Sequence, residues 1–277
     1  SKIFAKNLMR KYKIPTANFE VFNDLDAALN YVNNHALPLV IKADGLAKGK
    51  GVVVAESLQE AEDALISCMR DKKFGASGEK VLIEECLTGP EVSVLAFTDG
   101  CTLVPMVSSM DHKRAYDNNQ GPNTGGMGFI APNPHYDFNM AARCEREIFM
   151  PTINAMNKEG RKFKGCLYFG LMLTPQGPKV IEYNCRFGDP ETQAVLPMMD
   201  SDFASLCSAI TDGSLKDFAL KWKDGFCVAP VAVSGGYPGA YKKGMQITLD
   251  YKAVSDSGAK VFIAGAIINR RSNSHTA

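Results

Sequence analysis

The sequence lacks a strong charge of either sign. Its 277 residues include 31 lysines and arginines and 30 aspartates and glutamates, so the formal net charge at pH 7 is only +1. Proteins that gather nucleic acid or anionic lipid need a field of one sign over at least part of their surface. The composition therefore predicts no nucleic-acid partner and no membrane partner.

The sequence also lacks long apolar runs, paired cysteines and clustered histidines. No stretch approaches the ~18 consecutive apolar residues that span a bilayer, and residues 1–6 lack the apolar core of a signal peptide. The eight cysteines are scattered without a Cys-x-x-Cys pair, and the four histidines are dispersed. A zinc site, a disulfide framework and a Ser-His-Asp arrangement are therefore unsupported. We expect a cytoplasmic protein with reduced thiols.

What is present is the composition of a globular protein, with 45% hydrophobic and 22% charged residues. A chain of this length predicts one large domain or two of ordinary size. The chain opens without a methionine on a predicted helix, and it ends on a polar run without periodicity over residues 269–277. We interpret both ends as truncated or altered.

The apolar periodicity predicts an alternation of helices and strands. Helices are expected after the possible caps Ser1, Asp24 and Ser57, the last of which has Glu60 at capping-box spacing. Strands are expected at residues 19–22, 39–41 and 81–83, as a hairpin over 91–98 and 102–107, and as a pair at 166–173 and 179–183. Residues 108–135 are rich in glycine, asparagine and proline and are expected to form a long functional loop.

A segment rich in glycine and lysine spans residues 42–51, between two β runs. Its glycines expose backbone N–H groups and its lysines supply positive charge, which suits a loop that folds over a polyphosphate. It is not a Walker A loop, because no Gly-Lys-Ser/Thr occurs and a strand follows it. A mobile basic hairpin turn explains the segment equally well.

Glu182 and Asn184 end a predicted strand and share one of its faces through the two-residue period. A carboxylate and an amide oxygen suit Mg²⁺, which often takes only one or two protein ligands besides phosphate oxygens and waters. Arg186 and Asp189 follow directly, and a guanidinium there can bind phosphate or carboxylate. The alternative is a solvated strand end with an Arg–Asp ion pair.

The predicted long loop combines charge with glycine. Asp111 and Arg114 bound a charged quartet, and residues 121–128 contain four glycines and Asn123. Glycines let a backbone approach a ligand closely, and Arg114 can neutralise a transferring phosphoryl group. A flexible surface loop is the alternative.

Three glutamates lie at neighbouring strand ends. Glu84 and Glu85 close one predicted strand, and Glu91 begins the next. Such an edge can pair its backbone with an adenine while a carboxylate holds ribose hydroxyls. Ordinary surface glutamates explain the pattern at least as well.

Taken together, the order of these segments closely resembles the ATP-grasp fold. The strings IKADGLAKGKGV, DHKR, GPNTGGMG and EYNCRFGDPET resemble those of the phosphoribosylamine–glycine ligase (glycinamide ribonucleotide synthetase) family, from Ser1 to about Phe262. The resemblance implies an α+β ATP-grasp domain over residues 1–196, with a lid subdomain at about 15–85. It further implies an incomplete β-rich C-terminal domain over residues 197–277.

The resemblance implies a ligase of purine biosynthesis. The glycine carboxylate would attack the γ-phosphate of ATP, and the amine of 5-phosphoribosylamine would capture the resulting glycyl phosphate. Glycinamide ribonucleotide, ADP and phosphate would be the products. Such chemistry needs Mg²⁺ or Mn²⁺, and the protein supplies mainly positioning and charge neutralisation. Animal members of the family form part of larger multifunctional polypeptides.

The resemblance also implies roles for individual residues. The ATP phosphates would be contacted by Lys2, Lys42, Lys48, Gly49, Lys50, Gly51, Arg114 and Asn123. The adenine would be lined by Glu84, Glu85, Cys86 and Leu87, and the ribose would be held by Glu91. Glu182 and Asn184 would bind the metal. Four residues would face glycine or the phosphoribosyl group: Asp111, Gly126, Met127 and Arg186. The catalytic residues would be Arg114 and Arg186.

The sequence departs from the family pattern in several places. We find no match to the family's separate N-terminal domain of roughly a hundred residues, Ile263 stands where the pattern has a histidine, and the tail after Ala266 does not match. No carboxylate lies between Gly165 and Ile181, so protein ligands for the metal are sparse. Two alternatives stay open: another ATP-grasp carboxylate–amine ligase, or a non-catalytic ATP-binding remnant.

Overall fold

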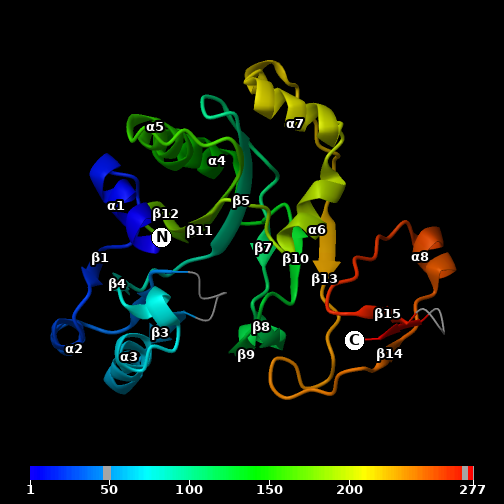
Figure 1. The fold of residues 1–277 in the computed structure, drawn as a ribbon. Coiled ribbons are helices and arrows are strands. Elements are labelled where there is room, and N and C mark those ends of the chain that lie inside the picture. The colour runs from blue at the N-terminus through cyan, green and yellow to red at the C-terminus, as the bar shows by residue number, and fades with distance from the viewer. Residues whose placement is uncertain (46–50, 270–273, 277) are drawn as a thin grey trace.

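The first part of the chain forms a four-stranded antiparallel sheet with the strand order β1-β4-β2-β3, here called the small sheet (Figure 1). The computed structural model describes residues 1–45, 51–269 and 274–276. The strands of the small sheet are β1 (Phe19–Phe22), β2 (Leu39–Ala43), β3 (Val52–Ala55) and β4 (Val81–Glu85). Helices α2 (Leu25–Asn33) and α3 (Leu58–Leu65) pack against it, and a π-helical turn over Ile66–Arg70 extends α3.

The helix starts follow local hydrogen-bonding rules. Ser1 caps α1 (Lys2–Tyr12), Asp24 caps α2, and Ser57 with Glu60 forms a complete capping box on α3, so all three predicted caps are confirmed. Each cap satisfies a backbone N–H that the first helical turn leaves without a partner. Because these signals are local, they could be read from the sequence.

A second antiparallel sheet, here called the large sheet, has the strand order β12-β11-β5-β6. Its strands are β5 (Glu91–Thr98), β6 (Leu103–Pro105), β11 (Gly165–Thr174) and β12 (Gly177–Asn184). Both predicted hairpins are confirmed, since β5 pairs with β6 and β11 pairs with β12. Figure 1 shows helices α1, α4 (Phe138–Cys144) and α5 (Met150–Lys158) on one side of this sheet, with a π-helical turn over Glu145–Phe149 joining the last two.

The two faces of the large sheet bury different cores. Val92 and Val94 of β5 point to the core shared with α1, α4 and α5, whereas Leu95 and Phe97 point to the core beneath α6 (Glu191–Val195) and α7 (Phe203–Asp212). This alternation is the two-residue period of a strand that is buried on both faces. The sheet therefore forms the middle layer of three.

The prediction of a long loop over residues 108–135 was wrong. The segment contains β7 (Met110–Asp111), β8 (Arg114–Tyr116), β9 (Gln120–Asn123) and β10 (Gly128–Ala131). The β8–β9 pair forms a hairpin, and β10 pairs with both β7 and β13 (Cys227–Pro230). Strands this short carry too little periodicity to detect, and partners distant in sequence set their pairing.

The last part of the chain contains short elements. The strands β14 (Gln246–Ile247), β15 (Ile267–Asn269) and β16 (Ser274–Thr276) form a sheet with the order β14-β16-β15. Helix α8 (Tyr251–Ser257) lies between β14 and β15 in the sequence. Short 3₁₀ turns lie at Gly75–Gly78, Asp117–Asn119, Leu196–Met198 and Leu215–Asp217. All eight cysteines are free thiols. Over the described ranges, no helix combines the length and the apolar character needed to cross a membrane.

Candidate functional site

A buried cluster of charged side chains lies where the small sheet meets β12. Lys42 on β2 and Glu84 on β4 are only 6% and 4% exposed, and Lys42 Nζ lies 3.0 Å from Glu84 Oε2. The same ammonium donates to the carbonyl of Ile181 at 3.3 Å. A buried charge is tolerated only when it is paired, and its cost makes such clusters frequent at functional sites. Lys42 therefore links the small sheet to the strand that carries Glu182.

Lys2 lies at the edge of the same cluster. Its ammonium donates to the carbonyls of Ala43 at 2.8 Å and Gly45 at 2.9 Å. Burial lowers the pKa of Lys2, while the nearby charges of Glu182 and Asp44 act in the opposite direction. The side chain is thus held between the end of β2 and the metal-binding strand predicted from the sequence.

The predicted phosphate loop is described only at its two ends. Lys48, Gly49 and Lys50 lie outside the described residues. Gly51 is buried, and its carbonyl accepts from the N–H of Ala43 at 2.9 Å, which closes the β2–β3 hairpin. The loop therefore leaves and re-enters the small sheet next to Lys2 and Lys42.

The predicted adenine segment divides into two parts. The carboxylate of Glu85 accepts from Lys179 Nζ at 3.0 Å and from the backbone N–H of Asn18 at 3.0 Å. Burial acts against its ionisation, but these donors hold the pKa of Glu85 below its usual value. Cys86 and Leu87 follow β4 outside the sheets. Glu85 thus links β4 to Asn18 and to Lys179 on β12, and Cys86 and Leu87 follow directly after β4.

A surface ion pair joins Glu91 at the start of β5 to Lys113, which lies between β7 and β8. Partial burial opposes the charged form of Lys113, but the charge and hydrogen bond of Glu91 outweigh it and raise the pKa of this lysine. Our sequence reasoning selected Arg114 from the charged quartet and missed Lys113. The local sequence carried no signal for it, because its partner Glu91 is 22 residues away on another strand.

Arg114 lies on the β8–β9 hairpin. It is paired in register with Asn123, and its guanidinium donates to the carbonyl of Gly121 at 2.8 Å. Arg114 and Asn123 are both exposed. The hairpin therefore brings these two predicted phosphate contacts together, as neighbours on its surface.

In each of two carboxylates beyond this hairpin, one oxygen lacks a hydrogen-bond donor. Within the described residues, Oδ1 of Asp111 and Oε2 of Glu191 are buried oxygens without a hydrogen-bond partner. Burial raises the pKa of Asp111 to about 7, with Glu191 and Glu91 adding to the rise and Lys113 opposing it. Burial also raises the pKa of Glu191. Acceptors of this kind suit a ligand that brings its own N–H or O–H donors.

Gly126 and Met127 border Asp111. A Cβ atom on Gly126 would lie 3.3 Å from Asp111 Oδ1 and 3.1 Å from Cδ of Pro190, and the glycine has a φ of +120°. Only glycine adopts this backbone conformation readily in so tight a space. Met127 donates its N–H to the carbonyl of His112 at 2.8 Å, which fixes the turn. The structure thus brings these two predicted substrate residues to the Asp111 carboxylate.

Glu182 and Asn184 lie near the end of β12. Asn184 Nδ2 donates to Glu182 Oε1 at 3.2 Å, so the carboxylate and the amide reach a common point on one face of the strand. Among the described residues, no group of three or more His, Cys, Asp or Glu side chains is arranged to hold a metal ion. The protein ligands available at this position are therefore few.

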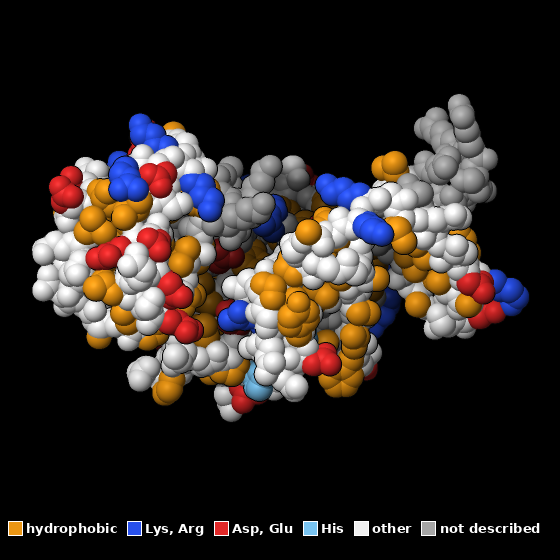
Figure 2. Space-filling model, turned by 90° about the horizontal axis from the view of Figure 1, so that it is seen from below, with side chains coloured by type: hydrophobic (Ala, Val, Ile, Leu, Met, Phe, Trp, Pro, Cys, Tyr) orange, Lys and Arg blue, Asp and Glu red, His pale blue; other side chains and the backbone are white. Residues whose placement is uncertain are grey.

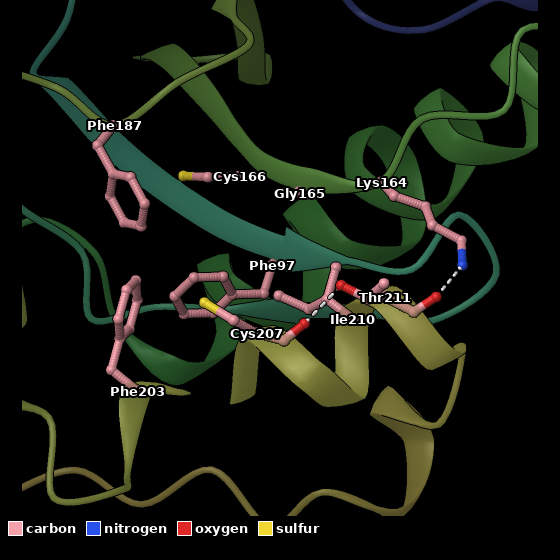
Figure 3. A pocket seen from close by; sticks show the side chains of 9 residues that line it. All are labelled: Phe97, Lys164, Gly165, Cys166, Phe187, Phe203, Cys207, Ile210 and Thr211. Carbon is pink, nitrogen blue, oxygen red and sulfur yellow. Dashed lines mark hydrogen bonds between the residues drawn. The ribbon is translucent and has the colours of Figure 1, made fainter. Parts of the chain in front are cut away.

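Arg186 follows in the segment after β12. It is exposed, its guanidinium donates to the carbonyl of Phe187 at 2.8 Å, and its charge opposes the rise in the pKa of Glu191. The next side chain, Phe187, points to an apolar pocket of about 400 Å³ near α7 (Figure 3). There its ring centroid lies 6.0 Å from that of Phe97 and 6.1 Å from that of Phe203. The segment therefore has a charged side and an aromatic anchor.

Electrostatic coupling connects these groups into one site. Lys113 interacts with Glu91, Asp111 and Glu182, and Lys2 interacts with Glu182. The contributing elements are β2 and β4 of the small sheet, β5 and β12 of the large sheet, and the β7–β9 region. In Figure 2 the surface is hollowed near the middle of the molecule, with basic and acidic side chains along the hollow. The site is thus a charged cleft between two sheets.

Comparison with known proteins identifies the family. Residues 1–192 match the model of the phosphoribosylglycinamide synthetase ATP-grasp (A) domain. The phosphoribosylamine–glycine ligase of Caldanaerobacter subterraneus subsp. tengcongensis is 49% identical over 247 residues, which are 89% of this chain and 59% of that protein. The trifunctional purine biosynthetic protein adenosine-3 of Gallus gallus is 45% identical over 270 residues, covering 97% of this chain and 27% of that protein.

The solved structures agree with this result. The crystal structure of phosphoribosylamine–glycine ligase from Thermotoga maritima has a TM-score of 0.88 at 34% identity and covers 100% of this chain and 68% of that chain. Biotin carboxylase from Campylobacter jejuni has a TM-score of 0.67 at 15% identity, covers 87% of this chain and 53% of that chain, and shows the fold alone. The chain spans about 60% of the length of the single-function relatives, with shares of 59%, 63% and 58%. The chain has the ATP-grasp fold and belongs to the phosphoribosylglycinamide synthetase family, whose curated relatives are named phosphoribosylamine–glycine ligases.

Proposed function

We propose that the site performs the ATP-dependent joining of glycine to 5-phosphoribosylamine, a step of purine biosynthesis, through a glycyl phosphate intermediate. One observation carries the proposal. Lys42 contacts both Glu84 and the carbonyl of Ile181, so a buried ammonium lies beside the strand that ends in Glu182 and Asn184. Phosphoryl transfer needs this combination of a fixed cation and hard metal ligands.

In this proposal the ATP phosphates bind near Lys2 and Lys42, and the loop over Lys48–Gly51 closes over them. The adenine lies along the segment after β4, at Cys86 and Leu87, with Glu84 and Glu85 fixing the end of that strand. Glu91 holds the ribose, and its pairing with Lys113 places a second cation nearby. Arg114 and Asn123, side by side on their hairpin, contact the phosphates from the other side.

The donor set near the end of β12 fits a hard divalent ion. Glu182 offers a carboxylate, and the amide of Asn184 is close enough to share a ligand with it, given the 3.2 Å contact. A turn of this amide about its side-chain bond would present oxygen instead of nitrogen to the metal. We propose Mg²⁺ or Mn²⁺ here, completed by phosphate oxygens and water, where it would neutralise phosphate charge.

The substrates occupy the far side of the cleft. Asp111 and Glu191 offer buried acceptors without donors, which suit the amino group of glycine or of 5-phosphoribosylamine. Arg186 supplies a cation for the glycine carboxylate, and Gly126 and Met127 shape the wall beside Asp111. Holding the two reactants together converts a bimolecular reaction into an effectively unimolecular one. Arg114 and Arg186 stabilise the charge that moves between ATP, glycine and the amine.

The cellular setting follows from the chemistry and from the relatives. All substrates in this proposal are small molecules, and we expect the reaction in the cytoplasm. Relatives in Schizosaccharomyces pombe and Gallus gallus are named bifunctional and trifunctional purine biosynthetic proteins. We therefore propose that the site can operate as one part of a larger purine-synthesis polypeptide.

Release of ADP tests the proposal. We expect the chain with Mg-ATP, glycine and 5-phosphoribosylamine to form ADP, and omission of either co-substrate to abolish this release. A series of other small carboxylates and amines is the control for specificity. Faster turnover with another carboxylic acid would replace the glycine assignment, and calorimetric binding of Mg-ATP without any turnover would contradict catalysis.

A further inference from the structure

The buried cluster contains a second lysine that has no assigned role. Lys6 lies on α1 and is 2% exposed, and its ammonium lies 3.2 Å from Glu84 Oε2, the same oxygen that Lys42 contacts. It also donates to Thr16 Oγ1 at 2.8 Å and to the carbonyl of Ala17 at 3.0 Å. All three N–H groups of Lys6 therefore have partners in the protein.

Lys42 differs from Lys6 in this respect. Within the described part of the chain its ammonium has two acceptors, Glu84 and the carbonyl of Ile181, so one of its three N–H groups is left for a ligand. Lys6 is enclosed further by the ring of Phe19, whose centroid lies 5.0 Å from the ammonium. The geometry thus makes Lys42 a candidate ligand contact and makes Lys6 a residue that acts through its neighbours.

The contacts of Lys6 close a ring that crosses the boundary between the two sheets. Glu84 and Lys42 belong to the small sheet, and Lys42 continues to Ile181 on β12. Lys6 also reaches β12 through Thr16. It donates to the Thr16 hydroxyl, which in turn donates to the carbonyl of Val180 on β12 at 2.7 Å. Lys6 therefore fixes the Glu84 carboxylate relative to the strand that carries Glu182.

The charge of the cluster depends on Lys6. One buried carboxylate shared between two buried ammonium groups leaves one positive charge, whereas Lys42 and Glu84 alone would sum to zero. A neutral pair attracts a polyphosphate weakly, because each field cancels the other at short range. Burial lowers the pKa of Lys6 to about 8; Glu84 and Glu85 on β4 act against this, and Lys42 on β2 adds to it. The ion pair with Glu84 favours the charged form of Lys6.

We propose that Lys6 is a positioning residue for nucleotide binding, which shares Glu84 with Lys42 so that Lys42 keeps its place and its uncompensated charge beside the nucleotide phosphates. The inference rests on the proposed binding of ATP at this site. It adds a residue that touches neither ATP nor metal and acts entirely through Glu84 and Thr16.

Calorimetric titration with Mg-ADP tests the inference on four proteins: the parent, Lys6→Met, Lys6→Met with Glu84→Gln, and Lys11→Met as the matched control. Lys11 lies on the same helix, is exposed, and pairs with Glu159 away from the cluster. We expect the dissociation constant to rise about tenfold or more in Lys6→Met, because a charge close to the phosphates is lost. Lys11→Met should bind as the parent does.

The double variant separates positioning of charge from general loss of structure. Replacing Glu84 by Gln in the Lys6→Met background removes the carboxylate that neutralises Lys42, so we expect it to recover part of the lost affinity. Circular dichroism checks folding. If Lys6→Met does not fold, Thr16→Val removes one partner of Lys6 at constant volume and should weaken Mg-ADP binding about two- to tenfold.

The outcomes distinguish the inference from the proposed function. A parent that binds Mg-ADP, together with a Lys6→Met protein of equal affinity, would overturn the role of Lys6 and leave the proposed function standing. Weaker binding by the double variant than by Lys6→Met would also overturn it, as would a Thr16→Val protein that binds as the parent does. A parent that binds no nucleotide would overturn the proposed function, and this inference with it.

Discussion

The environment of the Asp111 carboxylate favours a ligand that donates a hydrogen bond. Its Oδ1 is buried without a donor, and two other carboxylates, Glu191 and Glu91, lie close enough to disfavour its charge. Such an arrangement lowers the stability of the free protein, because an ionised carboxylate without a partner is expensive to bury. A ligand amine that donates to it would offset that cost.

The titration of Asp111 predicts how stability depends on pH. Its pKa is raised from 3.8 to about 7, so the folded chain keeps a proton that the unfolded chain has lost between pH 4 and 7. The contribution to stability therefore falls as pH rises through this range, and the loss is complete above pH 7. We expect Asp111→Asn to raise the melting temperature by several degrees at pH 8 and by much less at pH 5.

Thermal unfolding followed by circular dichroism at both pH values checks this prediction. Asp224→Asn is the matched control, because that side chain is exposed and should change little at either pH. An equal gain at pH 5 and pH 8, or no gain at pH 8, would show that the Asp111 charge is not the cause.

Substitutions of Glu182 and Arg186 should affect the use of different substrates. Glu182→Ala removes the carboxylate beside Asn184 and should raise the KM for Mg-ATP roughly 10- to 100-fold, the loss of a charged hydrogen-bonding ligand. Arg186→Ala should act mainly on the KM for glycine. Steady-state kinetics with each substrate varied in turn measures both effects. Parent-like use of Mg-ATP by Glu182→Ala would contradict the metal assignment.

Contacts between residues close together in the sequence could be predicted, whereas contacts that only the fold creates could not. Glu182 and Asn184 are two residues apart on one strand, so the sequence showed that they share a face. Lys113 was missed because its partner Glu91 is 22 residues away on another strand. Lys6 was missed for the same reason, since Glu84 and Thr16 reach it only through the packing of α1.

At the scale of elements, the segment after β12 combines a charged residue with an aromatic anchor. Arg186 is exposed, and the ring of Phe187 packs against those of Phe97 and Phe203 in the apolar pocket (Figure 3). Tight packing restricts the backbone that it holds. The packing of Phe187 in the pocket therefore restrains the backbone of the segment that carries Arg186.

Truncation of this anchor tests the coupling. Phe187→Ala should lower the free energy of unfolding by about 2 kcal/mol, less than the 3–5 kcal/mol of a fully buried phenylalanine, because Phe187 is half-buried. We expect the KM for glycine to rise several-fold while the KM for Mg-ATP stays unchanged. Chemical denaturation and kinetics measure the two effects. Phe138→Ala, which removes a ring that is 85% exposed, is the control.

An unchanged KM for glycine in Phe187→Ala would show that the segment after β12 does not depend on its aromatic anchor. Equal changes for both substrates would point to general loosening of the domain instead. Either result would separate Arg186 from the pocket behind it.

The elements themselves were predictable in proportion to how local their signals are. Caps at Ser1, Asp24 and Ser57 and the hairpins of the large sheet were predicted correctly, because each depends on residues a few positions apart. The strands within residues 108–135 were not, because β10 gains its partners from β7 and from β13, about a hundred residues later. Distant pairing leaves no periodicity in a four-residue strand.

For the whole molecule, the cleft between the two sheets carries the function that we propose. Lys42 and Glu84 come from the small sheet, whereas Glu182 and the segment of Arg186 come from the large sheet. The linear order of the motifs was sufficient to identify the family. It could not show that the buried ammonium of Lys42 touches the carbonyl of Ile181, because that contact joins strands 139 residues apart.

We propose that ATP phosphorylates the carboxylate of glycine, and the transfer of a carboxylate oxygen to phosphate is the decisive test. Glycine labelled with ¹⁸O in its carboxylate is incubated with the chain, Mg-ATP and 5-phosphoribosylamine, and the released phosphate is analysed by mass spectrometry. Attack of the carboxylate on the γ-phosphate predicts one ¹⁸O atom in each phosphate, because the amine then expels phosphate with the former carboxylate oxygen. Product formed together with unlabelled phosphate would rule out attack of the glycine carboxylate on ATP.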